Sequence, residues 1–334
     1  MSSERPSFII KEPELQILVN LFEEVEIRYP VTHLPLFDCR WGGKDYRIKS
    51  RFDRGSFTIA DEDAYLEGPS YSDVIECLMS SGVLGFTNVE EFRKRLEAYR
   101  NHRKVFFALD TNMIYRRFVS NTGLIDPNEC LIVSTVRDEV TSVHNFKYSQ
   151  DWVQQMKRAA PFERGLLEEL VNRRMKKSRK ASRFANRELL ALAGATNVDA
   201  DERFTGEEGQ GDRIIARTVS RFVRERGVQT VMLTADCSMV DICEAEGVEY
   251  FLFEMPKEVP PELGCNDSRL IRLVSDLASV LALVKLNSVI LYGEFRAKRD
   301  KDDLKAVFLD RLLGDEFKVD LETCRRLLSL GMSR

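Results

Sequence analysis

One stretch constrains the fold of this chain more than any other: an apolar run that is followed directly by three polar residues. The run extends from Val105 to Leu109, and Asp110, Thr111 and Asn112 follow it. A strand without a polar side is typical of a sheet that helices cover on both faces. An acid at the carboxyl end of such a strand lies where open α/β sheets bind their ligands. The alternative is that Asp110 only caps the next helix.

Further apolar runs follow at 130–133, 228–233 and 248–253, and segments with helical patterns separate them. Strands that alternate with helices indicate βαβ units. We therefore expect an α/β fold with a parallel sheet sandwiched by helices.

The length of 334 residues suits roughly two domains or more. We expect an α/β amino-terminal module at 1–103, a core domain at 104–255 with a helical basic insertion at about 150–205, and a mainly helical carboxyl-terminal extension at 256–334. The insertion should hold long helices at 151–172 and 175–192. The extension should hold helices at 268–286, 302–313 and 321–330 and a strand at 288–292. It could pack on the core or join two copies of the chain into a homo-oligomer, and the sequence leaves both options open.

Charge and cysteine content narrow the class of protein. The net charge of −4 gives no overall attraction to nucleic acid, so such a partner needs a local basic patch. The seven cysteines are odd in number and lack the C-x-x-C spacing of zinc sites, which favours a reducing, cytoplasmic location. No segment suits a signal peptide or a membrane span, and we expect no membrane partner.

Four acids stand at comparable junctions between strands and helices. Asp110 and Asp236 each follow an apolar strand, Glu139 lies on the apolar face of a helix, and Asp212 opens another helix. Crowded carboxylates repel one another unless a cation compensates them, and oxygen ligands suit Mg²⁺ or Mn²⁺. The alternative for each acid is a helix cap, or for Glu139 an ion pair with Arg217. The three histidines do not fall among these acids, which counts against a histidine-based mechanism.

These motifs together resemble those of PIN-domain nucleases, over about residues 104–254. The resemblance implies an endoribonuclease that hydrolyses phosphodiester bonds in single-stranded RNA. It also implies that Asp110, Glu139, Asp212 and Asp236 are catalytic residues that bind Mg²⁺ or Mn²⁺. Supporting roles fall to Thr111, Asn112, Thr234, Ser238 and Asp241. Ser238 is a departure, because many members carry an acid there, and Asp241 stands one helical turn further on.

The long flanking segments favour a role in RNA processing or surveillance over that of a compact toxin. One alternative is a catalytically weak RNA-binding or scaffold protein that keeps the PIN fold. A phosphatase or phosphoacceptor domain is another, although Asp110, Thr111 and Asn112 lack the paired D-x-D expected of such phosphatases after the first strand.

A cluster of basic residues between two expected helices is the candidate RNA contact. It consists of Arg173, Arg174, Lys176, Lys177, Arg179, Lys180, Arg183 and Arg187. Phosphate contacts of this kind supply affinity with little sequence selectivity. Phe184 is a candidate for stacking on a base. The alternative is a solvated helix that the acids of 199–202 and 207–208 neutralise.

Overall fold

The computed structural model describes residues 5–57, 67–101, 104–143, 145–202 and 209–331. The chain forms two compact units. Unit 1 combines Met1–Val83, Lys147–Lys176 and Val259–Arg334, and unit 2 combines Leu84–Phe146 and Lys177–Glu258. This arrangement differs from the expected three consecutive parts, because strands from both ends of the chain pair in one sheet. No helix among the described residues is long and apolar enough to cross a lipid bilayer.

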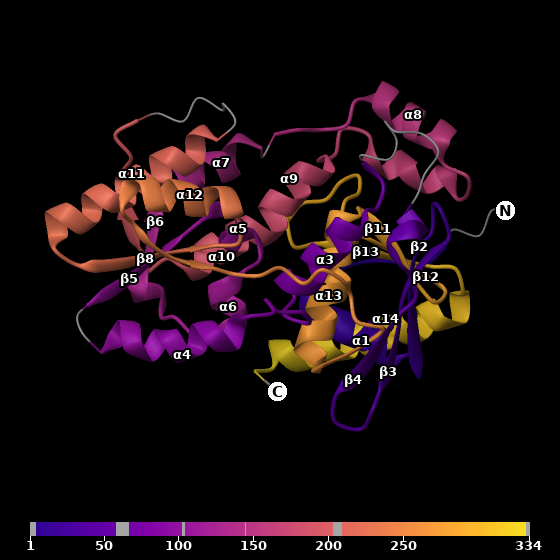
Figure 1. Cartoon of the computed structure of the whole chain (residues 1–334). Coiled ribbons are helices and arrows are strands. Elements are labelled where there is room, and N and C mark those ends of the chain that lie inside the picture. Colours follow the sequence, from indigo (N-terminus) through magenta and orange to yellow (C-terminus); the bar gives the residue numbers. More distant parts are fainter. Residues whose placement is uncertain (1–4, 58–66, 102–103, 144, 203–208, 332–334) are drawn as a thin grey trace. The chain divides into compact units, whose positions relative to one another are not determined.

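Unit 2 is built on a five-stranded sheet in which every neighbouring pair is parallel, with helices on both of its faces (Figure 1). Its strands, in spatial order, are β7 (Thr196–Val198), β6 (Cys130–Val133), β5 (Val105–Leu109), β8 (Gln229–Thr234) and β9 (Glu249–Leu252). The central strand β5 is buried at all five positions, as its unbroken apolar run predicts. The expected mixed α/β fold with a parallel sheet is therefore confirmed.

The helices of unit 2 begin and end at recognisable signals. They are α4 (Val89–Arg100), α5 (Thr111–Tyr115), α6 (Phe118–Thr122), η3 (Pro127–Glu129), α7 (Ser134–Ser142), α9 (Lys176–Lys180, which starts at the unit boundary), the π-helical turn η5 (Ala181–Ala185), α10 (Asn186–Ala191), α11 (Gln210–Arg226) and α12 (Cys237–Glu246). Gly227 and Gly247 end α11 and α12 with backbone φ angles of 59° and 66°, a left-handed conformation that glycine adopts without steric cost.

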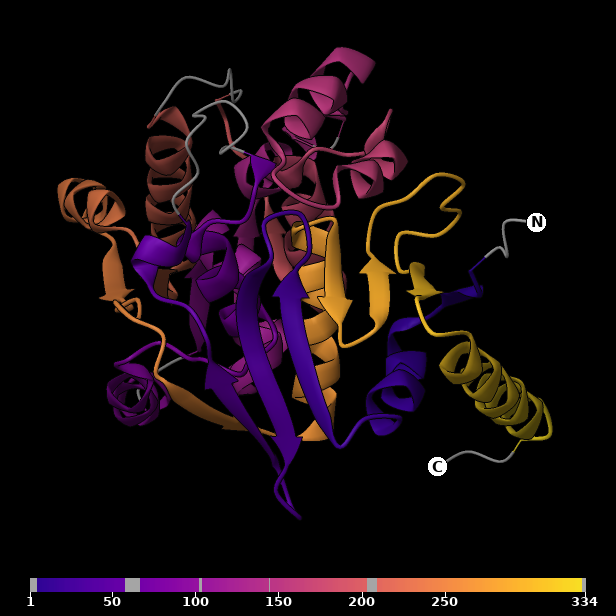
Figure 2. The same cartoon turned by 90° about the vertical axis from the view of Figure 1, so that its right-hand side faces the viewer.

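Unit 1 contains an eight-stranded antiparallel sheet, counted over the described residues (Figure 2). Its spatial order is β1 (Ser7–Ile10), β13 (Leu304–Phe308), β12 (Val289–Tyr292), β11 (Leu283–Leu286), β2 (Glu24–Tyr29), β3 (Leu34–Trp41), β4 (Tyr46–Ser50) and β10 (Glu262–Cys265). The helical segments of this unit are η1 (Glu12–Glu14), α1 (Leu15–Asn20), η2 (Arg54–Phe57), α3 (Tyr71–Ser80), α8 (Gln150–Ala159), η4 (Arg164–Leu170), α13 (Asp267–Val280) and α14 (Arg311–Ser329).

Two helices expected in the carboxyl-terminal part of the chain differ from the structure. The helix expected at 302–313 is instead strand β13, in which Leu304, Ala306 and Phe308 are buried with the two-residue period of a strand. The helix expected to reach residue 286 ends at Val280, because strand β11 begins at 283. The strand expected at 288–292 is confirmed as β12.

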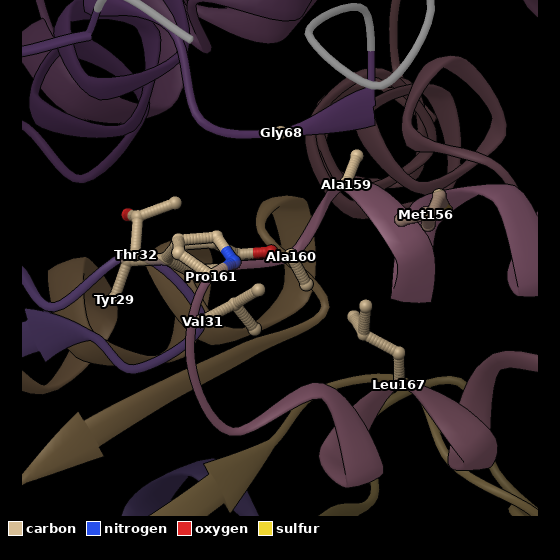
Figure 3. Close-up of a pocket in the computed structure, with 9 residues that line it drawn as sticks. All are labelled: Tyr29, Val31, Thr32, Gly68, Met156, Ala159, Ala160, Pro161 and Leu167. Carbon is tan, nitrogen blue, oxygen red and sulfur yellow. The ribbon is translucent and has the colours of Figure 1, made fainter. Parts of the chain in front are cut away.

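The long helix expected at 151–172 is also interrupted. Helix α8 ends before Ala160, whose φ of −69° and ψ of 119° are extended. The reason is Pro161, since the ring of a proline disfavours helical geometry in the residue before it. Figure 3 shows Ala160 and Pro161 on the wall of a small, mainly apolar cavity of about 30 Å³, whose lining contains no acid, lysine, arginine or histidine.

Candidate active site

Two of the four acids lie at one edge of the sheet of unit 2. Strands β5 and β8 are parallel neighbours, and Leu109 stands opposite Leu233 in their register. The next residue on β5 is Asp110, whose backbone N–H donates to the Leu233 carbonyl at 3.1 Å. Asp236 follows the end of β8 by two residues, so both acids come from the carboxyl ends of adjacent strands. This is the edge where open α/β sheets bind ligands.

The hydroxyl of Thr234 connects these two acids. It donates to Oδ2 of Asp110 at 2.6 Å and accepts from the backbone N–H of Asp236 at 3.0 Å. Asn112 also donates its side-chain amide to Oδ2 of Asp110, and its own oxygen accepts from the Ala235 N–H at 3.1 Å. Asp110 is 3% exposed, and these donors fix its carboxylate in one orientation.

Glu139 and Asp212 approach the same region from two helices. Glu139 lies on α7 and accepts a hydrogen bond from the hydroxyl of Thr111. Asp212 lies in the first turn of α11. Both side chains are only partly exposed. The four acids thus come from four segments that are far apart in the sequence.

The carboxylates are close enough to perturb one another. Burial, together with the negative charges of Asp212 and Glu139, raises the pKa of Asp110 to about 7. Burial and the charge of Asp212 raise the pKa of Glu139, and burial and the charge of Asp236 raise the pKa of Asp212. The four acids therefore share one negative field.

No ion pair involves any of these four acids within the described part of the chain. The alternative that Arg217 neutralises Glu139 is wrong, because Arg217 pairs with Glu202 and Glu246, each at 3.1 Å. A buried carboxylate without a cation is costly, so the cluster is electrostatically unsatisfied as it stands.

The helix-cap alternative holds for one acid. Asp236 caps α12 by accepting from the Ser238 N–H at 2.8 Å. Asp110 occupies the cap position of α5 without a side-chain capping bond, and Asp212 lies inside α11, whose cap residue is Gly209. Capping therefore explains Asp236 and leaves Asp110 and Asp212 without that explanation.

The remaining supporting residues contribute less. Ser238 takes part through its backbone N–H, and its exposed side chain supplies no carboxylate. Asp241 is exposed one helical turn further along α12. Of the histidines, His33 belongs to unit 1, and positions 102 and 144 lie outside the described residues.

The candidate RNA contact between 173 and 187 is not an exposed basic surface, so that expectation is wrong. Arg179, Arg183 and Lys176 are 3%, 4% and 8% exposed, and Phe184 is fully buried. Arg173, Arg174, Lys180 and Arg187 are half-buried, and only Lys177 among the basic residues is exposed. The helix is therefore not solvated either, and residues 207–208 of the acidic alternative lie outside the described residues.

Lys176 has a structural role in unit 1. Its ammonium donates to Asp73 at 2.8 Å and to the carbonyl of Gly68 at 2.6 Å, and all of these contacts are buried. A charge paired in this way is not available to a phosphate group.

The oxygen atoms of the acid cluster suit a divalent cation, whereas the side chains as they are placed do not form a complete set of ligands. Carboxylate oxygens of four acids suit Mg²⁺ or Mn²⁺. As the side chains stand, no three His, Cys, Asp or Glu residues in the described ranges are placed to hold an ion together.

Sequence reasoning missed one neighbour of the cluster, Cys243, and one exposed basic residue that follows Asp212 in the sequence, Arg213. Burial, together with the negative charges of Asp110 and Asp212, raises the pKa of the Cys243 thiol to about 12. Arg213 is exposed beside Asp212 at the start of α11. A basic residue adjacent to a motif acid was the available signal for Arg213, whereas Cys243 had none.

No protein-family model matches the chain, and no curated protein matches it.

Proposed function

We propose that unit 2 is a PIN-type endoribonuclease that uses Mg²⁺ or Mn²⁺ to hydrolyse phosphodiester bonds in single-stranded RNA. The observation that carries the proposal is the convergence of four carboxylates at one sheet edge, where none of them forms an ion pair with a cationic side chain of the described residues. Acids that only stabilise a fold rarely cluster in this way, whereas a metal-dependent active site requires such a cluster.

The chain supplies ligands, orientation and charge. Asp110, Glu139, Asp212 and Asp236 would hold the ion. When bound, such an ion supplies a more acidic water and neutralises charge on the scissile phosphate. Thr234 and Asn112 fix the carboxylate of Asp110 at the sheet edge, so that less reorganisation is needed during the reaction.

Two further side chains act at the rim of this cluster. Thr111 donates to Glu139 and limits how far that carboxylate can turn. Arg213, exposed beside Asp212, is the residue on α11 that would contact a phosphate of the RNA backbone. An RNA bound mainly through phosphates is bound with little sequence selectivity, which suits a processing or surveillance role in the cytoplasm.

The test is cleavage of a labelled single-stranded RNA by the full chain in the presence of Mn²⁺. We expect Asp110→Asn to reduce the rate at least about 100-fold, because it removes the central carboxylate. Asp138→Asn is the matched control, since Asp138 is exposed on α7 beside Glu139. Equal rates for wild type and Asp110→Asn, or cleavage that persists in EDTA, would refute the proposal.

A catalytically weak RNA-binding or scaffold protein that keeps this fold is the second candidate. Two observations favour it: Ser238 replaces an acid, and the carboxylates are not yet spaced to share an ion. The variant Ser238→Asp separates the two candidates. A weak enzyme should gain metal-dependent cleavage from the added carboxylate, whereas a pure binder should retain RNA without any cut.

A further inference from the structure

A pocket of about 350 Å³ opens on unit 1 beside helix α1. Its walls come from α1, the bend before β2, the hairpin ends of strands β3 and β4, and the first turn of α13, all labelled in Figure 1. Pockets of about 300–1,000 Å³ are typical of sites that hold small molecules. We call it the α1 pocket, and its lining indicates which kind of molecule fits.

Two aromatic residues form one wall of the α1 pocket. Trp41 and Tyr46 are register partners at the end of the β3–β4 hairpin, and their ring centroids lie 5.1 Å apart in an edge-to-face arrangement. Tyr46 is 8% exposed, whereas Trp41 is 46% exposed. The indole of Trp41 is therefore accessible to a ligand. The face of such a ring attracts cations and packs well against methylene groups.

The charges that line the α1 pocket are all negative. Glu23, in the bend before β2, and Asp267, in the first turn of α13, are exposed, and no lysine, arginine or histidine of the described residues lines the pocket. Neither acid forms an ion pair within the described part of the chain. A place in a first turn explains Asp267 in part, because a negative charge stabilises the start of a helix, whereas Glu23 belongs to no helix. The two negative charges suit a ligand with two positive charges.

The carboxylate of Asp267 also acts on the aromatic wall. Burial and, more weakly, the charge of Asp267 raise the pKa of Tyr46. On the opposite side, Gln16 donates its side-chain amide to Oδ1 of Asn20 at 2.7 Å, one turn further along α1. Carboxylates and amide oxygens accept hydrogen bonds from N–H groups, which primary and secondary ammonium ions carry.

A metal ion does not explain this lining. No three His, Cys, Asp or Glu residues in the described ranges are placed to hold one together, and aromatic rings are not ligands for a hard cation. An organic cation uses both the rings and the acids. We propose that the α1 pocket binds a small aliphatic diamine or polyamine, whose ammonium groups face Glu23 and Asp267 and whose methylene chain lies on Trp41.

Calorimetric titration of the full chain with butane-1,4-diamine, up to about 10 mM at low ionic strength, measures this binding. Butylamine, with one charge, and butane-1,4-diol, with none, are the matched ligands. We expect the diamine to bind at least about three-fold more tightly than butylamine, because it meets both acids. The diol should not bind measurably.

Substitutions in the lining locate the binding site. Glu23→Gln, Asp267→Asn and Trp41→Ala should each weaken binding of the diamine at least about three-fold, because each removes a charge or the ring that meets the ligand. Glu24→Gln is the matched control and should bind like wild type. Side chains on a strand alternate between its two faces, so Glu24 points away from the face on which Val25 lines the pocket. Circular dichroism of each variant confirms that it is folded.

Fluorescence gives a second measurement of occupancy. The chain contains two tryptophans, so in the variant Trp152→Phe only Trp41 emits, and its emission should change with the same dissociation constant. Equal affinities for the diamine and the diol, or no binding at 10 mM, would overturn the proposal. Unchanged affinity in both Glu23→Gln and Trp41→Ala would overturn it as well. A lysine-containing peptide that binds more tightly than the diamine would overturn the assignment to a small molecule.

Discussion

Replacing the central acid of the candidate site should make the metal-free protein more stable. Asp110 is 3% exposed, and burial and two neighbouring acids raise the pKa of its carboxyl to about 7, against 3.8 for an exposed aspartate. The folded state therefore favours the protonated form. Above pH 7 the ionised carboxylate opposes folding, and Asp110→Asn removes that charge while it keeps the shape of the side chain.

The magnitude follows from the linkage between protonation and folding. A difference of about 3 pKa units corresponds to roughly 4 kcal/mol at pH 8. The loss of one hydrogen bond to the carboxylate returns about 1 kcal/mol. We expect a net gain near 3 kcal/mol in the free energy of unfolding.

The direction of the pKa shift determines the pH range in which the variant and wild type differ in stability. The stability that the protonated form contributes is fully present below about pH 4, the pKa of the unfolded carboxyl, and is lost as the pH rises through about 7. The variant should therefore be slightly less stable than wild type at pH 4, by the roughly 1 kcal/mol of the lost hydrogen bond, and more stable than wild type at pH 8.

Calorimetric unfolding in EDTA at pH 4 and pH 8 measures this difference. Asp138→Asn, which alters an exposed acid, is the control and should unfold like wild type at both pH values. Added Mn²⁺ should stabilise wild type more than Asp110→Asn. The reasoning is refuted if Asp110→Asn gains nothing at pH 8, or if it gains as much at pH 4.

Two further predictions concern unit 1. Lys176→Met should lower the free energy of unfolding in urea by about 3–5 kcal/mol, because it removes the buried ion pair of 2.8 Å between Lys176 and Asp73. Lys177→Met, at an exposed position, should change it little, and equal effects would contradict the structural role of Lys176. Gly293→Ala should cost about 3 kcal/mol or more, because the added methyl would lie 2.4 Å from the backbone of α13. Gly165→Ala has open space around it and serves as the control; a soluble, equally stable Gly293→Ala would contradict that packing.

The sequence predicts individual strands and helices better than it predicts which segments of the chain form each unit. The parallel sheet of unit 2 follows from unbroken apolar runs and the glycines that end the helices, both of which are local signals. The eight-stranded sheet of unit 1 joins β1 to β13 across almost the whole chain. Such pairing depends on contacts between distant segments, and no window of neighbouring residues reports it.

The position of the candidate site's acids could be predicted from the sequence, whereas the burial of the basic residues could not. Asp110 and Asp236 follow parallel strands, so topology alone brings them to one edge. Charge composition cannot tell an exposed lysine from one that stabilises a core. Lys176 is bound to a buried acid, and Arg179 is inside the fold, so the run of basic residues marks packing and not an RNA surface.

Diffraction from crystals grown with Mn²⁺, recorded at the manganese absorption edge, shows directly whether the four acids bind a metal ion. We expect an anomalous peak about 2.1 Å from a carboxylate oxygen of Asp110, with Glu139, Asp212 or Asp236 completing the ligands. Crystals of Asp110→Asn should lose that peak. Ordered carboxylates without any peak among them, at millimolar Mn²⁺, would contradict a metal-dependent site.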